Sequence, residues 1–240
     1  MPTNKPNYDQ FVGVQKSKQL VLDFPKLDAD LEPLIATPAS EDARLALSRW
    51  EYWPERQMCL IGSAGSGKTR MLRNWAQDTG AAYVTGVDLS AAEIDEISGL
   101  SVKALVVDNA DSCSNGGSLL AAMNLCKSRG AFLLLSGSTD PSSWNMKPLD
   151  LQSRLSALPV VKFGAIDEET LKIRLVSACK SKFMKLPDET ADYLVQRLAR
   201  TYLVIDEIVE KLELVAAGKA LNRTTARKAI AALEQSTNFE

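Results

Sequence analysis

Short runs of apolar residues alternate along the first two thirds of the chain with segments whose apolar positions recur at helical spacing. The apolar runs are predicted to be strands, at residues 57–61, 81–84, 102–108, 131–136 and 159–163. The segments around them, at 41–50, 70–76, 91–97 and 118–127, are predicted to be helices. Strands that are apolar on both faces and separated by helices indicate an α/β fold with a parallel sheet covered on both sides.

Beyond residue 166 the strand pattern ends and only helical spacing remains. Residues 168–180, 187–200, 203–217 and 224–234 are each predicted to be helical. The first residues of the chain are polar instead and are predicted to form a flexible tail. We therefore expect an N-terminal tail (1–26), an α/β core (27–165) and a small all-helical lid domain (166–240).

A complete phosphate-binding loop, G-x-x-x-x-G-K-T, lies between the first strand and the helix that follows it. Its residues are Gly62, Ser63, Ala64, Gly65, Ser66, Gly67, Lys68 and Thr69. The glycines let the backbone curl around a polyphosphate, so that backbone N–H groups and the helix N-terminus face its oxygens. Lys68 would reach the β- and γ-phosphates, and the Thr69 hydroxyl would bind Mg²⁺. Nucleotide binding is therefore expected.

The strand 102–108 ends in an aspartate, Asp108, which we interpret as a Walker B carboxylate that holds Mg²⁺, usually through water. The next residue is Asn109, at a position where an acidic base is common. A neutral amide can orient a water molecule but cannot accept its proton. Asp111 is one candidate to compensate, from an uncertain position beyond the strand. Slow intrinsic hydrolysis and a long-lived nucleotide complex are expected.

Two further polar residues follow predicted core elements. Ser138 comes just after the strand 131–136 and is a candidate phosphate-sensing residue, although a hydroxyl there can equally serve as a cap. Arg154 precedes the last core strand and could project from the surface. It would then stabilise transition-state charge on a neighbouring molecule's γ-phosphate, or form an ordinary surface ion pair.

The polar tail contains one apolar stretch, Gln-Leu-Val-Leu-Asp-Phe at 19–24. Alternating large apolar groups in a flexible segment can dock as an extended peptide into the pockets of a partner. The residues expected to bind are Gln19, Leu20, Leu22 and Phe24. The alternative is an edge strand or a contact with the chain's own core.

Composition narrows the remaining possibilities. The 240 residues carry a formal net charge of −2, so no global basic field favours nucleic acid or membrane. The absence of histidine excludes His-based nucleophilic triads and the usual zinc sites. Four scattered cysteines indicate free thiols in a reducing compartment. With no membrane-length apolar run and no signal peptide, a cytoplasmic protein is expected.

Taken together, these motifs resemble the DnaA-related AAA+ proteins, and most closely the Hda family, which inactivates the replication initiator. Residues 19–24 match that family's sliding-clamp-binding motif, and 34–40 resemble the segment that lines its adenine pocket, with Leu34 and Ile35 as candidate contacts. Asp108-Asn109 matches its Walker B sequence. Ser153-Arg154-Leu155 falls on its arginine-finger box.

The resemblance implies a P-loop AAA+ core with a helical lid, binding ADP or ATP with Mg²⁺. It implies two partners: the sliding clamp (the β subunit of DNA polymerase III), and DnaA, whose ATP hydrolysis Arg154 would stimulate in trans. The segment after Ala217 has no room for a helix-turn-helix domain, so sequence-specific DNA binding is not expected. A homo-oligomer is left open.

One departure concerns the lid. The family's phosphate-sensing arginine corresponds to Leu203 here, and Arg200, one turn earlier, could substitute for it. Three alternatives also remain open: a DnaA-related helicase loader, an autonomous P-loop ATPase, and a clamp-binding adaptor with a vestigial nucleotide site.

Overall fold

The computed structural model describes residues 35–237 and leaves 1–34 and 238–240 outside the described part. The clamp motif 19–24 and Leu34 therefore lie outside the described residues. The described core contains five strands: β1 (Gln57–Ile61), β2 (Ala82–Thr85), β3 (Ala104–Asp108), β4 (Phe132–Gly137) and β5 (Val160–Lys162). Its α-helices are α1 (Glu41–Ser48), α2 (Lys68–Thr79), α3 (Ala91–Gly99), α4 (Gly116–Arg129) and α5 (Leu149–Ser156).

All five strands are parallel and lie in the order β2-β3-β4-β1-β5. The predicted α/β fold is confirmed, and each predicted strand starts and ends within two residues of the observed one. Because β4 lies between β1 and β3, the carboxyl ends of these three strands meet at one edge. In parallel α/β sheets this edge is where ligands bind.

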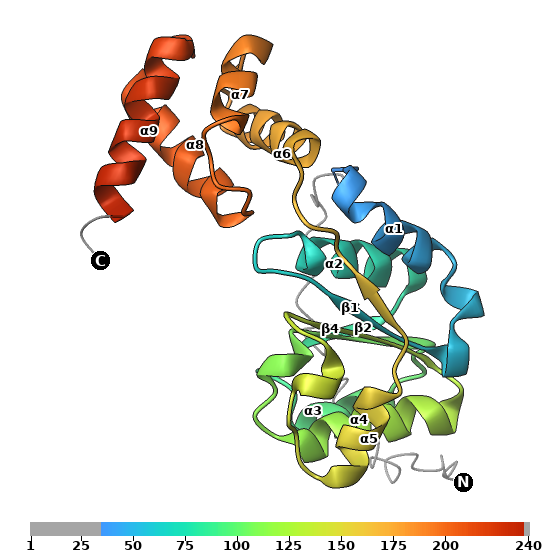
Figure 1. The fold of residues 1–240 in the computed structure, drawn as a ribbon. Helices are drawn as coiled ribbons and strands as arrows, with labels where there is room; N and C mark the ends of the chain where they lie inside the picture. Colours follow the sequence, from blue (N-terminus) through green and yellow to red (C-terminus); the bar gives the residue numbers. More distant parts are fainter. Residues whose placement is uncertain (1–34, 238–240) are drawn as a thin grey trace, which may run out of the picture.

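Successive strand residues point to opposite faces of the sheet, and both faces are buried. Cys59, Leu105 and Leu133 belong to an apolar cluster shared with α3, α4 and α5. Their neighbours Leu60 and Leu134 belong to a second cluster shared with α1 and α2. Figure 1 shows the same arrangement, with α1 and α2 on one face of the sheet and α3, α4 and α5 on the other.

The second apolar cluster contains three tryptophans. The ring of Trp75, on α2, stacks against Trp53 at 5.3 Å between centroids and meets Trp50 edge-on at 5.9 Å. Trp50 and Trp53 both lie in the segment that leads from α1 into β1. This packing fixes the start of β1, and therefore the direction from which the strand enters the phosphate loop.

Helix α5 is absent from the sequence-based prediction. It is two turns long, and only Leu151 and Leu155 are buried along it, so the chain shows too few repeats to reveal a helical period. The predicted helix 187–200 is shorter in the structure, where α7 (Asp188–Val195) ends five residues earlier.

The C-terminal part of the described chain is a separate helical layer with its own apolar cluster. It comprises α6 (Glu168–Ser181), α7, α8 (Leu203–Ala216) and α9 (Arg223–Thr237). Figure 1 shows these helices beyond the end of β5, on the side of the core where α1 and α2 lie. The Gly164 amide donates to Ala39 O at 2.7 Å, and the Ala39 amide donates to Thr170 Oγ1 on α6 at 3.4 Å. These bonds join lid and core beside the phosphate loop.

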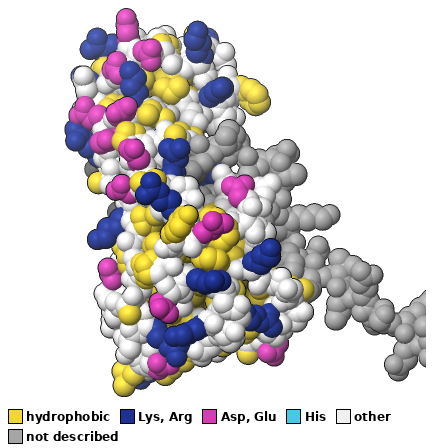
Figure 2. Space-filling view, turned by 90° about the vertical axis from the view of Figure 1, so that its right-hand side faces the viewer, with side chains coloured by type: hydrophobic (Ala, Val, Ile, Leu, Met, Phe, Trp, Pro, Cys, Tyr) yellow, Lys and Arg dark blue, Asp and Glu magenta, His cyan; other side chains and the backbone are white. Residues whose placement is uncertain are grey.

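Charged side chains are mixed on the surface. Figure 2 shows basic and acidic groups interspersed over the face that it presents, as the small net charge would suggest. Within residues 35–237, none of the helices has the length and apolar character needed to cross a membrane.

Candidate nucleotide site

The phosphate loop connects β1 to α2 and has the backbone conformation that its glycines permit. Gly65 and Gly67 have φ values of +74° and +105°, a region that other residues rarely adopt. A Cβ atom at Gly62 would lie 2.8 Å from Phe163 Cβ, closer than atoms can approach. Lys68 and Thr69 form the first turn of α2, so the loop ends at a helix N-terminus.

Lys68 is buried inside this loop. Its ammonium group donates to Gly62 O at 2.7 Å and to Ser63 O at 3.0 Å. Burial lowers the pKa of Lys68, and the carboxylates of Asp108 and Asp111 oppose that shift. The charge is thus held within the loop by neutral acceptors, which negatively charged phosphate oxygens would outcompete.

The loop borders a cavity of about 580 Å³ whose lining fits a polyphosphate. Four cationic side chains line it and no carboxylate does: Lys68, Arg70, Arg73 and Arg174. The hydroxyl of Ser66 is buried in the loop without a hydrogen-bond partner among the described atoms. A buried polar atom of this kind needs an acceptor or donor, and a phosphate would supply one. The residues present therefore fit a nucleotide.

Asp108 ends β3 at the edge of the same site and is only 1% exposed. The Tyr83 hydroxyl, from β2, donates to its Oδ2 at 2.7 Å, and the Ser136 hydroxyl, from β4, donates to its Oδ1 at 2.5 Å. Burial and the bond to Asp108 raise the pKa of Tyr83. Both carboxylate oxygens thus accept a hydroxyl donor, which holds Asp108 firmly. Asp108 and Thr69 remain the residues that would hold Mg²⁺, the aspartate through water.

Asn109 and Asp111 follow Asp108 in a tight turn. Asn109 has a left-handed backbone, φ 53° and ψ 49°, and its backbone N–H donates to Ser136 Oγ at 2.8 Å. The Asn109 side chain lines the cavity. Asp111 Oδ2 accepts the Ser138 amide at 2.6 Å, so its carboxylate is engaged with the loop after β4. No carboxylate base lines the cavity beside Asn109.

The structure gives different surroundings to the two serines of β4 and its loop. Ser138 is exposed, and its suggested phosphate-sensing role stays a prediction. Ser136 is fully buried and links Asp108 to the Asn109 amide, a role that the sequence-based reasoning missed. One signal was available: a hydroxyl inside a uniformly apolar strand needs a buried partner.

The two lid positions considered from the sequence, Leu203 and Arg200, do not line the cavity. Leu203 is 58% exposed, and Arg200 forms an ion pair with Glu168. Arg174, on α6, was not singled out from the sequence, yet it lines the cavity and donates to Gly65 O at 3.1 Å. On the core side, Arg73 lies against the ring of Tyr83, 5.7 Å from its centroid.

Arg154 lies on α5, in the helical layer opposite α2, and it does not line the nucleotide cavity. Its guanidinium donates to Asn124 Oδ1 at 2.7 Å and to Asp150 Oδ1 at 3.2 Å, with an ion pair to Asp150 Oδ2 at 3.1 Å. The side chain is 34% exposed. Ile35, the remaining adenine-side candidate, is half-buried and lies outside the cavity lining.

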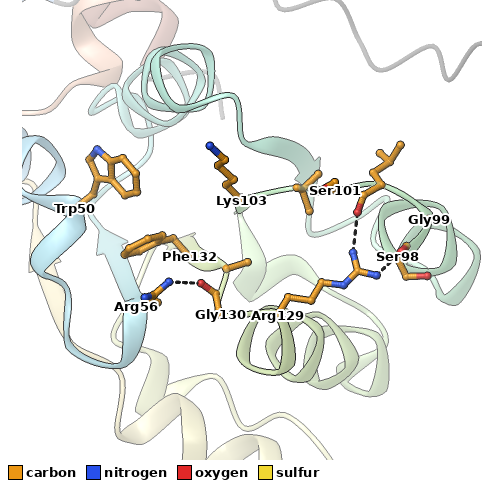
Figure 3. Close-up of a pocket in the computed structure, with 12 residues that line it drawn as sticks. Trp50, Arg56, Ser98, Gly99, Ser101, Lys103, Arg129, Gly130 and Phe132 are labelled. Atoms are coloured by element: carbon orange, nitrogen blue, oxygen red, sulfur yellow. Dashed lines mark hydrogen bonds between the residues drawn. The ribbon is translucent and has the colours of Figure 1, made fainter.

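A second cavity, of about 660 Å³, lies at the amino ends of β3 and β4. Figure 3 shows two arginines bonded to backbone carbonyls around it: Arg56 to Gly130, and Arg129 to Ser98 and Leu100. These bonds join the loops at this edge of the sheet. Among the described residues that line this cavity there is no glycine-rich loop and no N-terminus of an α-helix, so the phosphate-binding features lie at the other end of the strands.

Comparison with known proteins gives no match to a protein-family model. An uncharacterized protein of Haemophilus influenzae is 28% identical over 169 residues, which is 64% of this chain and 71% of that protein.

Among solved structures, domain III of the Thermotoga maritima replication initiation protein DnaA has a TM-score of 0.68 at 18% identity. The match covers 85% of this chain and 95% of that one. A replication initiator DnaA bound to AMPPCP and single-stranded DNA matches with a TM-score of 0.61 at 21% identity, over 77% of this chain. The chain spans 64% of that DnaA chain.

A Thermotoga maritima RuvB variant matches with a TM-score of 0.63 at 17% identity, over 85% of this chain and 73% of that one. These identities establish a shared fold. The described chain therefore has the fold of the AAA+ domains of DnaA and RuvB.

Proposed function

We propose that this protein is an AAA+ regulator of replication initiation that binds an adenine nucleotide and stimulates ATP hydrolysis on DnaA in trans. The observation that carries the proposal is the placement of Arg154. The side chain lies away from the chain's own nucleotide cavity, partly exposed, and is oriented by Asn124 and Asp150. The ion pair with Asp150, the alternative considered from the sequence, is present but solvent-exposed and therefore weak, so a phosphate on another molecule could replace it.

The chain's own nucleotide has a structural role in this proposal. Tyr83 and Ser136 occupy both oxygens of Asp108, and Asn109 cannot accept a proton from water. The first feature holds the Mg²⁺-binding carboxylate in place, and the second favours slow hydrolysis. The bound nucleotide, ADP in the resting form, would then hold the core and lid in a fixed arrangement. The nucleotide would supply phosphate charge for Lys68 and an Mg²⁺ ligand when bound.

The sliding clamp is the proposed docking partner, through Gln19, Leu20, Leu22 and Phe24. The support for this step comes from the residue pattern alone. Replacing both Gln19→Ala and Phe24→Ala should abolish binding to the clamp and leave the thermal unfolding of residues 35–237 unchanged. Retained clamp affinity in that double variant would remove the docking assignment.

The experiment that tests the whole proposal follows ATP preloaded on DnaA, in the presence of DNA-loaded clamp. Wild type, Arg154→Ala and Arg154→Lys are compared, with Arg49→Ala, an exposed arginine at the end of α1, as the matched control. An arginine finger changes hydrolysis by about 10³- to 10⁵-fold in well-studied systems. Stimulation should therefore vanish with Arg154→Ala, stay very low with Arg154→Lys, and persist with Arg49→Ala.

No stimulation by wild type would contradict the regulator and favour the DnaA-related helicase loader instead. Stimulation that survives in Arg154→Ala would leave the regulator standing and remove the finger assignment.

A further inference from the structure

Two segments of the lid converge on one residue of the phosphate loop, Gly65. Arg174, in the middle of α6, donates to the carbonyl oxygen of Gly65 at 3.1 Å. Tyr202, just before α8, has its Cβ atom 3.0 Å from the position that a Cβ on Gly65 would take. Arg174 also lies over the Tyr202 ring, 5.7 Å from its centroid. A movement of the backbone at Gly65 therefore alters contacts with both α6 and the start of α8.

The charge of Arg174 is not neutralised locally. Burial lowers the pKa of Arg174; Tyr202 and, more weakly, Asp206 oppose that shift, and Arg70 adds to it. Within residues 35–237, however, no carboxylate forms an ion pair with Arg174; the hydrogen bond is to a neutral carbonyl. The guanidinium is thus a cation at the cavity wall whose observed acceptor is weaker than a phosphate oxygen.

The two other positions at which a lid arginine could serve are unsuited to the task. Leu203 is apolar, and Arg200 is directed to Glu168, away from the lining of the cavity. Neither lines the cavity beside the loop, whereas Arg174 does. The sequence pattern would place a phosphate-contacting arginine at the start of α8. In this structure α6 supplies the arginine beside the phosphate loop instead.

We infer that Arg174 is the lid residue that contacts the terminal phosphate of the bound nucleotide and so couples the number of phosphates to the position of the lid. This inference rests on the proposed nucleotide binding. When Arg174 exchanges the Gly65 carbonyl for a phosphate oxygen, the hydrogen bond that ties α6 to the phosphate loop is lost and α6 can shift. Because Tyr202 packs against both Arg174 and Gly65, the start of α8 shifts with it. A triphosphate extends further along the cavity than a diphosphate, so the two nucleotides give Arg174 different acceptors.

The test measures binding of ADP and of the non-hydrolysable AMPPCP, by calorimetry, to wild type, Arg174→Ala, Arg174→Lys and Arg200→Ala. Loss of a charge-assisted hydrogen bond corresponds to about 10- to 100-fold in affinity. Arg174→Ala should lose that factor for AMPPCP and less for ADP. Arg174→Lys keeps the charge and should recover part of it, while Arg200→Ala should bind both as wild type does.

Lid position gives a second readout. Spin labels at Glu51→Cys in the core and Glu210→Cys in the lid, both exposed positions, report the distance between the two parts. In wild type this distance should differ between the AMPPCP-bound and ADP-bound forms. The difference should disappear in Arg174→Ala and become smaller in Arg174→Lys. Thermal unfolding of each variant establishes that it is folded.

The outcomes distinguish a failure of the proposed nucleotide site from a failure of the Arg174 assignment. If wild type binds neither nucleotide, or if Lys68→Ala binds as tightly as wild type, the proposed nucleotide site itself fails. If wild type binds but Arg174→Ala shows unchanged affinities and an unchanged distance difference, only the assignment of Arg174 is overturned. The same holds if Arg200→Ala alone produces the loss. If Arg174→Ala does not fold, Arg174→Lys decides by the same two readouts.

Discussion

The bond between the Tyr83 hydroxyl and Asp108 gives a direct test of how the Walker B carboxylate is held. Tyr83→Phe removes only a hydroxyl group, whose oxygen lies 2.7 Å from Oδ2 of a carboxylate that is 1% exposed. A hydrogen bond to a charged group contributes about 1.5–3 kcal/mol. Because Tyr83 is half-buried and water can partly replace its hydroxyl, we expect the lower end, about 1.5 kcal/mol.

The assay is thermal unfolding without nucleotide, followed by circular dichroism. For a domain of this size each kcal/mol corresponds to roughly 2–4 °C, so Tyr83→Phe should lower Tm by about 3–6 °C. Tyr52→Phe is the matched control, because Tyr52 is 84% exposed and should stay within about 0.5 kcal/mol of wild type.

Two further measurements sharpen the test. Ser136→Ala removes the donor to the other carboxylate oxygen, and the double variant should show a coupling above about 0.5 kcal/mol, since both hydroxyls share Asp108. Intrinsic hydrolysis should stay slow in both single variants, because Asn109 still cannot accept a proton from water. If Tyr83→Phe is as stable as Tyr52→Phe, the hydrogen bond from Tyr83 contributes nothing to holding Asp108, and its assigned role is wrong.

Three other expectations follow from packing, backbone and burial. Trp75→Ala should lower the free energy of unfolding by about 3–5 kcal/mol in urea titrations, because the ring is buried against two other tryptophans; a loss below 1 kcal/mol would contradict this packing. Gly67→Ala should weaken nucleotide binding in calorimetry, because φ is +105° there; unchanged affinity would show that the loop tolerates a side chain. Burial raises the pKa of Cys126 to about 12 and that of Cys179 to about 11, so thiol reagents at pH 8 should label them only after unfolding. Stability should accordingly fall as pH rises above about 8.5, the ordinary thiol pKa, and rapid labelling of the native protein would contradict their burial.

The sequence was a good guide to the strands and a poorer guide to the contacts between them. Uniform apolar runs identified β1 to β5 because a parallel sheet buries both faces of each strand. The bond from Tyr83 to Asp108 joins residues 25 positions apart, and it depends on β2 pairing with β3 in one register, with Thr85 opposite Asp108. No local pattern reports such a register.

The lid shows the same difference at a larger scale. The helices of the lid were predicted from spacing, but the residue that reaches the phosphate loop depends on how the lid packs on the core. Nothing in the sequence distinguishes Arg174 from the other polar residues of its helix. Only the fold brings it to Gly65, 109 positions away. Arg154, in contrast, was singled out as a candidate from the residues around it. The structure places Asn124 and Asp150 beside its guanidinium, and its role in trans stays a prediction.

The most direct test of the proposed function is the single-turnover rate of ATP hydrolysis on DnaA, measured with saturating DNA-loaded clamp and either wild type or Arg154→Ala. Wild type should accelerate hydrolysis, and the alanine variant, with its own nucleotide still bound, should lose about 10³-fold or more of that acceleration. Equal acceleration by the two proteins would contradict the assignment of Arg154 as the finger, and no acceleration by wild type would contradict the regulator itself.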